Sequence, residues 1–204
     1  MSIVHRVIRK VTEFCLPESE SEVGIQALYA ALVASEARND LIFDDVLQNL
    51  EEGRSPLLLT ERTDHLEWFE RRLKPFAKNV VILRGGLGRK AQREVAEQLA
   101  SVPTNEERLI IATGRYIGEG FDDIRLDTLF LALPISWRGT LQQYVGRLHR
   151  QHEGKHELWV YDYVDQEVPV LLRMYRRRLK VYQAMGYEVI SANDQNDSVQ
   201  GGHS

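Results

Sequence analysis

Two arginines in the C-terminal half of the chain have side chains suited to binding phosphate. Arg147 and Arg150 are three residues apart, so on a helix they would lie on one face and converge on the same anion. A guanidinium is permanently charged, and its paired N–H donors match phosphate oxygens. Gln143 lies one turn earlier, and Gly146 leaves room for a close approach. The alternative is a solvated helix face whose arginines pair with nearby glutamates.

A second group of candidate residues follows an apolar run that we expect to be a buried strand. The run Leu109–Thr113 leads into a loop with three glycines in seven residues, and this loop ends at Asp122. Glycine-rich composition alone is typical of a flexible turn. In an open parallel sheet, however, functional groups gather beyond the carboxyl ends of the strands. We therefore expect this loop to belong to a site.

These segments resemble motifs V and VI of the second RecA-like domain of superfamily 2 helicases and translocases. The resemblance covers roughly residues 55–165, and it depends on three stretches that occur in the family's order: Ala112-Thr113, then Glu119-Gly120-Phe121-Asp122, then Gln143-x-x-Gly146-Arg147-x-x-Arg150. The resemblance implies that Arg147 and Arg150 are catalytic arginine fingers for ATP, an arrangement worth ~10³ to 10⁵ in rate. It also implies a role for Thr113 at the nucleic-acid backbone, and roles near the nucleotide for Gln143, Gly120 and Asp122.

The family also holds ATP and Mg²⁺ with a Walker A loop and an acidic box, which belong to its first RecA-like domain. Gly-Lys-Ser/Thr does not occur in these 204 residues, and the acidic pair Asp44-Asp45 lies in a helical pattern. We therefore expect both cofactors to be held mainly by an N-terminal RecA-like domain, in the same chain or in another. The isolated chain is expected to hydrolyse no ATP.

Two further turns are candidate nucleic-acid contacts. Thr60 follows the apolar run Leu57–Leu59 and resembles motif IV, although it is equally suited to capping the next helix. Arg84 and Gly85 follow another apolar run, but the turn lacks the spacing of a phosphate-binding fingerprint. Family position suggests that this turn contacts the nucleic-acid backbone. A plain glycine turn before a helix is an equal alternative.

Short apolar runs alternate with amphipathic stretches from residue 55 onward, which predicts a parallel α/β sheet of about five or more strands flanked by helices. We expect residues 1–54 to form a helical segment that packs on this RecA-like domain. The domain itself is predicted to span 55–190, with a long basic helix over 168–186 whose arginines form a solvated face or line a nucleic-acid channel. Residues 191–204 are polar and are expected to be disordered.

Composition sets the outer limits of the interpretation. A chain of 204 residues with 43% hydrophobic content has room for one substantial core, not for a two-domain motor. The net charge is −4, but residues 138–180 contain nine Lys/Arg and five Asp/Glu, so overall acidity does not exclude nucleic acid. Cys15 is the only cysteine, and no histidine spacing supports a metal site. Without a long apolar run or leader, we expect a cytoplasmic protein and no membrane partner.

The expected partner is DNA or RNA. The sequence around the motifs resembles bacterial and phage DEAD/DEAH-like and restriction-enzyme-like helicases more than RNA-specific DEAD-box proteins, which favours DNA. The competing interpretation is a non-catalytic RecA-like module that binds nucleic acid or protein. An independent enzyme is disfavoured because no nucleophile, base and orienting group fall together in the sequence.

Overall fold

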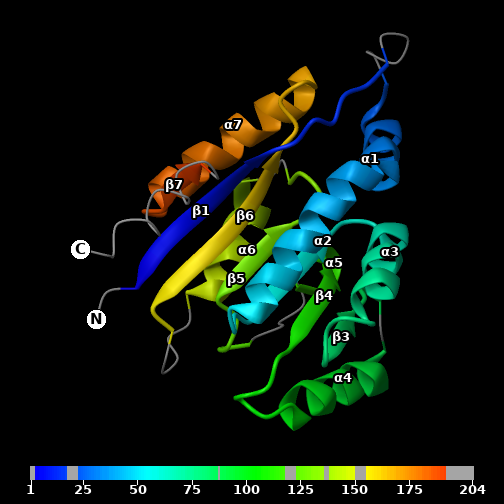
Figure 1. The fold of residues 1–204 in the computed structure, drawn as a ribbon, viewed down its shortest axis with the longest axis vertical. Helices are drawn as coiled ribbons and strands as arrows, with labels where there is room; N and C mark the ends of the chain where they lie inside the picture. Colours follow the sequence, from blue (N-terminus) through cyan, green and yellow to red (C-terminus); the bar gives the residue numbers. More distant parts are fainter. Residues whose placement is uncertain are drawn as a thin grey trace, which may run out of the picture.

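Seven parallel strands form one sheet in the order β3-β4-β2-β5-β6-β1-β7 (Figure 1). The structure, a computed structural model, describes residues 3–17, 23–86, 88–117, 123–135, 138–149 and 155–191. Because all strands are parallel, the sheet has one edge where strands begin, the amino edge, and one where they end, the carboxyl edge. The predicted α/β class and RecA-like parallel sheet are confirmed.

The bounds of the elements follow the alternation that the sequence predicts from residue 55 onward. The strands are β1 (Val4–Val11), β2 (Pro56–Thr60), β3 (Val80–Leu83), β4 (Leu109–Thr113), β5 (Thr128–Leu131), β6 (Glu157–Val164) and β7 (Glu188–Ser191). The helices are α1 (Ile25–Ala34), α2 (Glu36–Glu51), α3 (Thr63–Leu73), α4 (Arg89–Ser101), α5 (Gly114–Ile117), α6 (Arg138–Leu148) and α7 (Pro169–Ala184).

Helices cover both faces of the sheet, which explains why its central strands are continuously apolar. All residues of β2, β4 and β5 are buried. On one face, α2 and α3 pack a core that includes Ile42, Val46 and Phe69 (Figure 1). On the other face, α6 and α7 contribute side chains such as Leu148 and Tyr182. A strand buried on both faces has no polar side to alternate with, so its sequence shows an unbroken apolar run.

The N-terminal segment contains a strand as well as the helices that we expected there. β1 lies between β6 and β7, paired in parallel with both. Its sequence mixes apolar and basic residues, and only the side chains of Val7 and Ile8 are buried among its eight residues. We expected residues 191–204 to be disordered. Ser191 is the last residue of β7, and residues 192–204 lie outside the described residues.

Two buried ion pairs fasten helices from opposite faces to the carboxyl end of β6. Arg178 of α7 donates two hydrogen bonds to the Asp162 carboxylate, at 2.7 and 2.8 Å, and one to the Ile135 carbonyl at 3.2 Å. Arg38 of α2 pairs with Asp165 at 2.9 Å. Our assignment of Arg178 to a solvated or nucleic-acid-lining face is therefore wrong, because its side chain is only 3% exposed.

The burial of Arg178 and its pairing with Asp162 both affect the pKa of its guanidinium. Burial alone would lower the pKa of its guanidinium, but the Asp162 carboxylate raises that pKa overall by attraction and hydrogen bonding. Tyr182 donates a further hydrogen bond to the same carboxylate at 2.8 Å. A charge that is buried beside a hydrogen-bonded counter-charge stays ionised, so this pair is a structural tie and not a ligand site.

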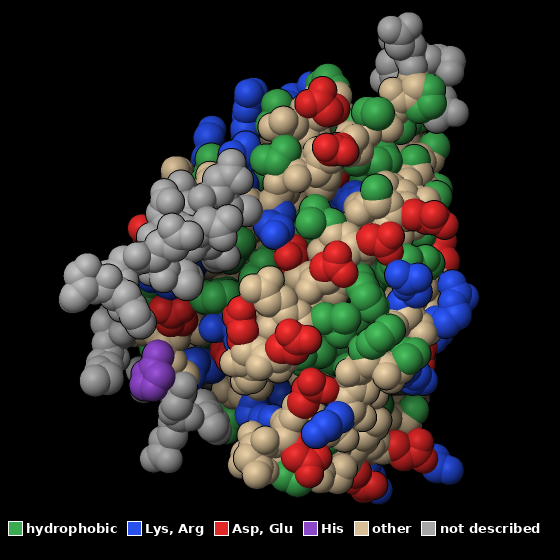
Figure 2. Space-filling model, viewed as in Figure 1, with side chains coloured by type: hydrophobic (Ala, Val, Ile, Leu, Met, Phe, Trp, Pro, Cys, Tyr) green, Lys and Arg blue, Asp and Glu red, His purple; other side chains and the backbone are tan. Residues whose placement is uncertain are grey.

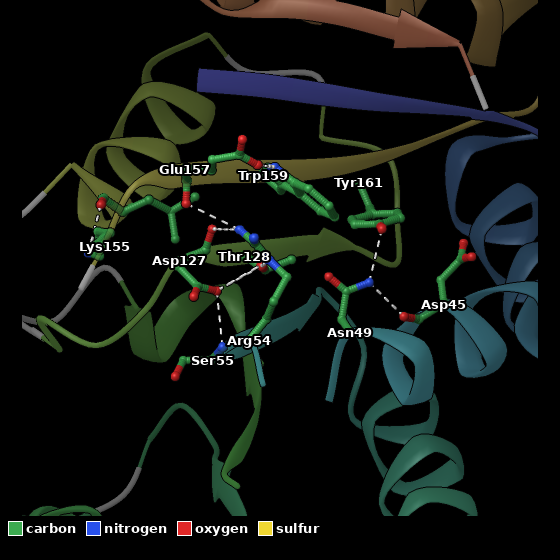
Figure 3. A network of polar contacts seen from close by, with 11 residues as sticks. Asp45, Asn49, Arg54, Ser55, Asp127, Thr128, Lys155, Glu157, Trp159 and Tyr161 are labelled. Carbon is green, nitrogen blue, oxygen red and sulfur yellow. Dashed lines mark hydrogen bonds and ion pairs between the residues drawn. The ribbon is translucent and has the colours of Figure 1, made fainter. Parts of the chain in front are cut away.

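A polar network at the amino edge joins the turn after α2 to β5 and β6 (Figure 3). Arg54 donates to the Thr128 hydroxyl at 2.6 Å and to the carbonyls of Asp127 and Glu157 at 3.1 and 3.2 Å. Its guanidinium carbon also lies 4.0 Å from the centre of the Trp159 ring. Trp159 is thus a cation–π partner of Arg54.

Within the part of the chain that the structure describes, no helix is long and apolar enough to cross a membrane.

Candidate functional site

Three of the predicted nucleic-acid contacts meet at the carboxyl edge. Thr60 ends β2 and Thr113 ends β4, and the two residues are direct partners in the pairing of these strands. Gly85 follows β3, on the other side of β4, and its N–H donates a hydrogen bond to the Thr113 hydroxyl oxygen at 3.0 Å. The sheet register therefore brings together residues that are up to 53 positions apart in sequence.

Because of the hydrogen bond between them, the Gly85 amide and the Thr113 hydroxyl differ in what they can still offer to a ligand. The Gly85 amide is used inside the protein, so it is not available to a phosphate in this arrangement. Thr113 accepts that bond, and among the described residues no group accepts a bond from its hydroxyl hydrogen. Thr113 is 9% exposed and can donate to a ligand at the edge.

Arg84 extends from the same turn but is already engaged. Its guanidinium pairs with Glu67 at 2.8 Å and Glu70 at 3.2 Å, both on α3. The side chain is 36% exposed, so these ion pairs are solvent-screened and worth little individually. An incoming phosphate can compete for this guanidinium, and the nucleic-acid role of Arg84 stays a prediction.

Thr60 has a structural partner that the sequence did not reveal. Its hydroxyl lies 3.0 Å from Nδ1 of His65, and Nε2 of the same ring lies 2.8 Å from Oδ1 of Asn39. Because the Asn39 amide nitrogen donates to the Val33 carbonyl, its oxygen faces His65 and accepts from Nε2. Nδ1 must then accept from the Thr60 hydroxyl. A phosphate contact by that hydroxyl stays a prediction and would require it to leave His65.

Burial makes this histidine a neutral group. His65 is fully buried, and burial, with a smaller effect of nearby Arg38, lowers its pKa to about 3. A neutral imidazole is needed if one ring nitrogen is to accept while the other donates. His65 therefore fixes the Thr60 side chain at the end of β2 without adding charge to the edge.

Glu61 and Tyr144 are neighbours of the candidate site that sequence reasoning missed. The Tyr144 hydroxyl of α6 donates to the Glu61 carboxylate at 3.5 Å, next to the backbone of Gly114. A Cβ at Gly114 would overlap both side-chain ends, so any larger residue there would have to displace Glu61 and Tyr144. Burial raises the pKa of Glu61, and the Tyr144 bond opposes that shift. The short helix α5 begins at Gly114, where we expected an irregular loop.

The structure describes the predicted nucleotide-side residues only in part. Gln143 is an exposed residue of α6, and Arg147 lies one turn later, but the Arg147 side chain is outside what the structure describes. Gly120, Asp122 and Arg150 lie outside the described residues altogether. Their predicted roles therefore remain predictions.

Two described residues that follow the undescribed segments, Asp123 and Lys155, lie close together at the amino edge. Lys155, just after the undescribed segment with Arg150, donates to the carbonyl of Leu148 at the end of α6 at 3.0 Å. Burial lowers the pKa of Lys155, and the carboxylates of Asp127 and Asp123 oppose this shift, so these charges lie close together. Asp123 follows Asp122 directly and pairs with Arg108 at 2.6 Å. Our expectation of one site at one edge of the sheet stays a prediction for these residues.

Known proteins share both the fold and parts of the sequence. The C-terminal domain of the DEAD-box protein Dbp5 superposes with a TM-score of 0.56 and 12% identity, covering 96% of this chain and 94% of that domain. This chain has the fold of a superfamily 2 C-terminal RecA-like domain. T4 UvsW matches over 93% of this chain and 41% of its own, with a TM-score of 0.70 and 17% identity.

Viral proteins are among the sequence relatives. Uncharacterized protein 108L of Invertebrate iridescent virus 3 is 35% identical over 92 residues, 45% of this chain and 84% of that protein, and the two belong to one family. Putative helicase 161L of Invertebrate iridescent virus 6 is 29% identical over 78% of this chain and 36% of its length. Transcript termination protein A18 of vaccinia virus (strain Ankara) is 26% identical over 60% and 24%. The chain thus spans about a third or less of the two longer relatives. No model of a known protein family matches it.

One structural neighbour is bound to RNA. Yeast Dbp5 L327V, bound to RNA and ADP BeF3, matches 97% of this chain and 44% of its own, with a TM-score of 0.58 and 11% identity.

Proposed function

We propose that this chain is the second motor domain of an ATP-dependent superfamily 2 nucleic-acid helicase or translocase. The observation that carries the proposal is the RecA-like sheet in which Thr60 and Thr113 end adjacent strands beside the Gly85 turn. These are the positions at which the motif resemblance expects backbone contacts. The alternative, a non-catalytic RecA-like binding module, shares this edge and differs in the role of the arginines.

In this proposal, ATP and Mg²⁺ are held mainly by an N-terminal RecA-like domain. Among the described residues, no group of three or more His, Cys, Asp or Glu side chains is placed to hold a metal ion. Bound ATP supplies a phosphoryl group for transfer to water. Arg147 and Arg150 supply fixed positive charge to that group, which lowers the cost of the charge that develops on it. Gln143, Gly120 and Asp122 line the same nucleotide side.

Nucleic acid is placed along the carboxyl edge, with DNA favoured over RNA by motif resemblance alone. The helical face drawn in Figure 2 is a poor alternative, because exposed carboxylates of Asp40, Asp44 and Glu51 lie along α2. Such a face repels phosphates. Thr113 offers a hydroxyl donor at the edge, and Arg84 offers a guanidinium that can exchange its glutamates for phosphate oxygens.

The test joins this chain to the N-terminal motor domain that the proposal requires and measures ATP turnover with and without single-stranded DNA or RNA. Arg150→Ala should lower turnover by at least ~10³-fold, the scale of an arginine finger, while nucleic-acid affinity changes little. Arg71→Ala is the matched control, because Arg71 is an exposed arginine on α3 to which the proposal gives no role.

Three outcomes distinguish the hypotheses. Loss of turnover in the Arg150 variant, with the Arg71 variant active, supports the motor domain. Turnover that survives in both variants favours the binding module. If RNA stimulates turnover more than DNA does, the preference for DNA would be wrong and the motor-domain proposal would still stand.

A further inference from the structure

Three aromatic rings stack at the C-terminal end of α6. The rings of His5 and His149 are nearly parallel, with centroids 4.6 Å apart and an interplanar angle of 10°. Tyr187 stacks at 5.0 Å from His5 and 5.7 Å from His149. The Tyr187 hydroxyl also lies 3.0 Å from Nε2 of His149, within hydrogen-bond distance. We call these three residues the ring stack.

The members of the ring stack come from elements that are distant in sequence. His5 is the second residue of β1, and Tyr187 directly precedes β7. His149 follows α6, and its N–H still bonds to the Gly146 carbonyl at 3.2 Å. The two strands at the end of the sheet thus contact the end of the helix that carries Arg147.

The position of Tyr187 is itself tightly specified. Gly186 has a φ of +79°, a left-handed conformation that side chains rarely adopt, and it turns the chain out of α7. The Tyr187 N–H then bonds to the Tyr182 carbonyl at 3.0 Å. Tyr187 is only 5% exposed, and His149 packs against its ring.

Neutral rings suit such a stack. Burial lowers the pKa of His5, and burial, His5 and Lys155 together lower that of His149. Both imidazoles are therefore uncharged near neutral pH, and no repulsion separates them. Burial also raises the pKa of Tyr187, so its hydroxyl keeps its proton.

Lys155 makes a second contact with the end of α6. Lys155 donates to the Leu148 carbonyl, a helix-terminal acceptor that lacks an intrahelical partner and carries negative partial charge. In sequence, Arg150 lies between the two contacts, one residue after His149 and five before Lys155. The chain on either side of this arginine is therefore fixed.

We infer that His149, together with His5 and Tyr187, is a positioning residue for Arg147 of α6. The inference rests on the proposed function, since it assigns the ring stack the task of holding the end of α6, and with it the backbone of Arg147, for contact with the nucleotide. None of the three rings needs to touch ATP. Misplacement of a catalytic group by about 1 Å can cost up to ~10²-fold in rate. A contact that holds the end of α6 in place therefore matters for the rate.

The first experiment measures amide hydrogen exchange by NMR in this chain alone. His5→Ala and Tyr187→Phe should each raise the exchange rate of the Leu148 and His149 amides about tenfold, because they release the helix end. His156→Ala is the matched control: it is an exposed histidine at the amino edge, next to β6. Unchanged exchange in both stack variants would overturn the inference, whatever the chain's function.

The second experiment measures ATP turnover of the two-domain assembly described above. His149→Ala should lower kcat about tenfold with KM for ATP changed less than about twofold. His149→Phe keeps a stacked ring without the hydrogen bond and should recover part of kcat. A merely structural role would instead lower activity only in proportion to the folded fraction, which thermal unfolding at the assay temperature reports.

The two failures are distinguishable. A wild-type assembly without turnover contradicts the proposed function, and the positioning role falls with it. A wild-type assembly that turns over ATP, with kcat unaffected by His149→Ala, overturns the positioning inference and leaves the proposed function standing.

Discussion

Replacing Arg178 with methionine removes one half of the ion pair that fastens α7 to β6. Arg178 and Asp162 have side chains only 3% and 1% exposed, so the variant leaves a carboxylate in the interior with the Tyr182 hydroxyl as its remaining described side-chain donor. Breaking a buried pair from one side costs about 3 to 5 kcal/mol. For a chain of this size, that corresponds to a melting temperature lower by roughly 10 °C.

The assay is urea unfolding followed by circular dichroism, with Arg177→Met as the control because Arg177 is exposed on the same helix. The control should change the unfolding free energy by less than about 0.5 kcal/mol. The double variant Asp162→Asn, Arg178→Met removes both charges and keeps an acceptor for Tyr182. It should be more stable than Arg178→Met alone, with a coupling of about 1 to 3 kcal/mol.

A loss below about 1 kcal/mol in Arg178→Met would refute the reasoning, because that is the scale of an exposed arginine. A double variant no more stable than the single one would also contradict it. In that case the cost would come from lost packing around the guanidinium stem and not from an uncompensated charge.

Three further perturbations test other parts of the structure. His65 has a folded pKa of about 3 against 6.5 unfolded, so the stability that it contributes above pH 6.5 should fall as pH drops toward 3; a ¹⁵N NMR midpoint near 6 for this ring would contradict it. Gly114→Ala should cost about 1 to 3 kcal/mol in urea unfolding, whereas Gly88→Ala, with open space around it, should cost almost nothing. Arg54→Met should shift Trp159 fluorescence and destabilise by about 2 kcal/mol; an unchanged spectrum would argue against their contact.

The central sheet was predictable because its signals are local. The run Leu109–Thr113 is apolar throughout, and it is the strand β4 with the same bounds. Strand β1 escaped prediction for the opposite reason. Basic residues interrupt its apolar ones, and its partner β6 lies about 150 residues away, so no local pattern marks it. Pairing that depends on distant sequence is invisible to periodicity.

The role of Arg178 was missed although a signal existed. Leu171, Tyr175, Arg178 and Tyr182 recur at spacings of three and four, so the arginine lies within the apolar stripe of α7. Counting basic residues does not distinguish Arg178 from the exposed arginines of α7, whereas its position relative to the apolar residues of the helix does. The Thr60–His65 pair had no comparable signal, because a side-chain hydrogen bond depends on how strand and helix meet in space.

The place of β1 in the sheet has a consequence for how the protein matures. Because β1 pairs with β6, which lies about 150 residues later in the chain, β1 has no neighbouring strand until β6 has been synthesised. Open strand sides invite association with other chains. Trimming residues 3–11 would leave β6 with such an open side permanently, so β1 protects the protein against aggregation as well as completing its sheet.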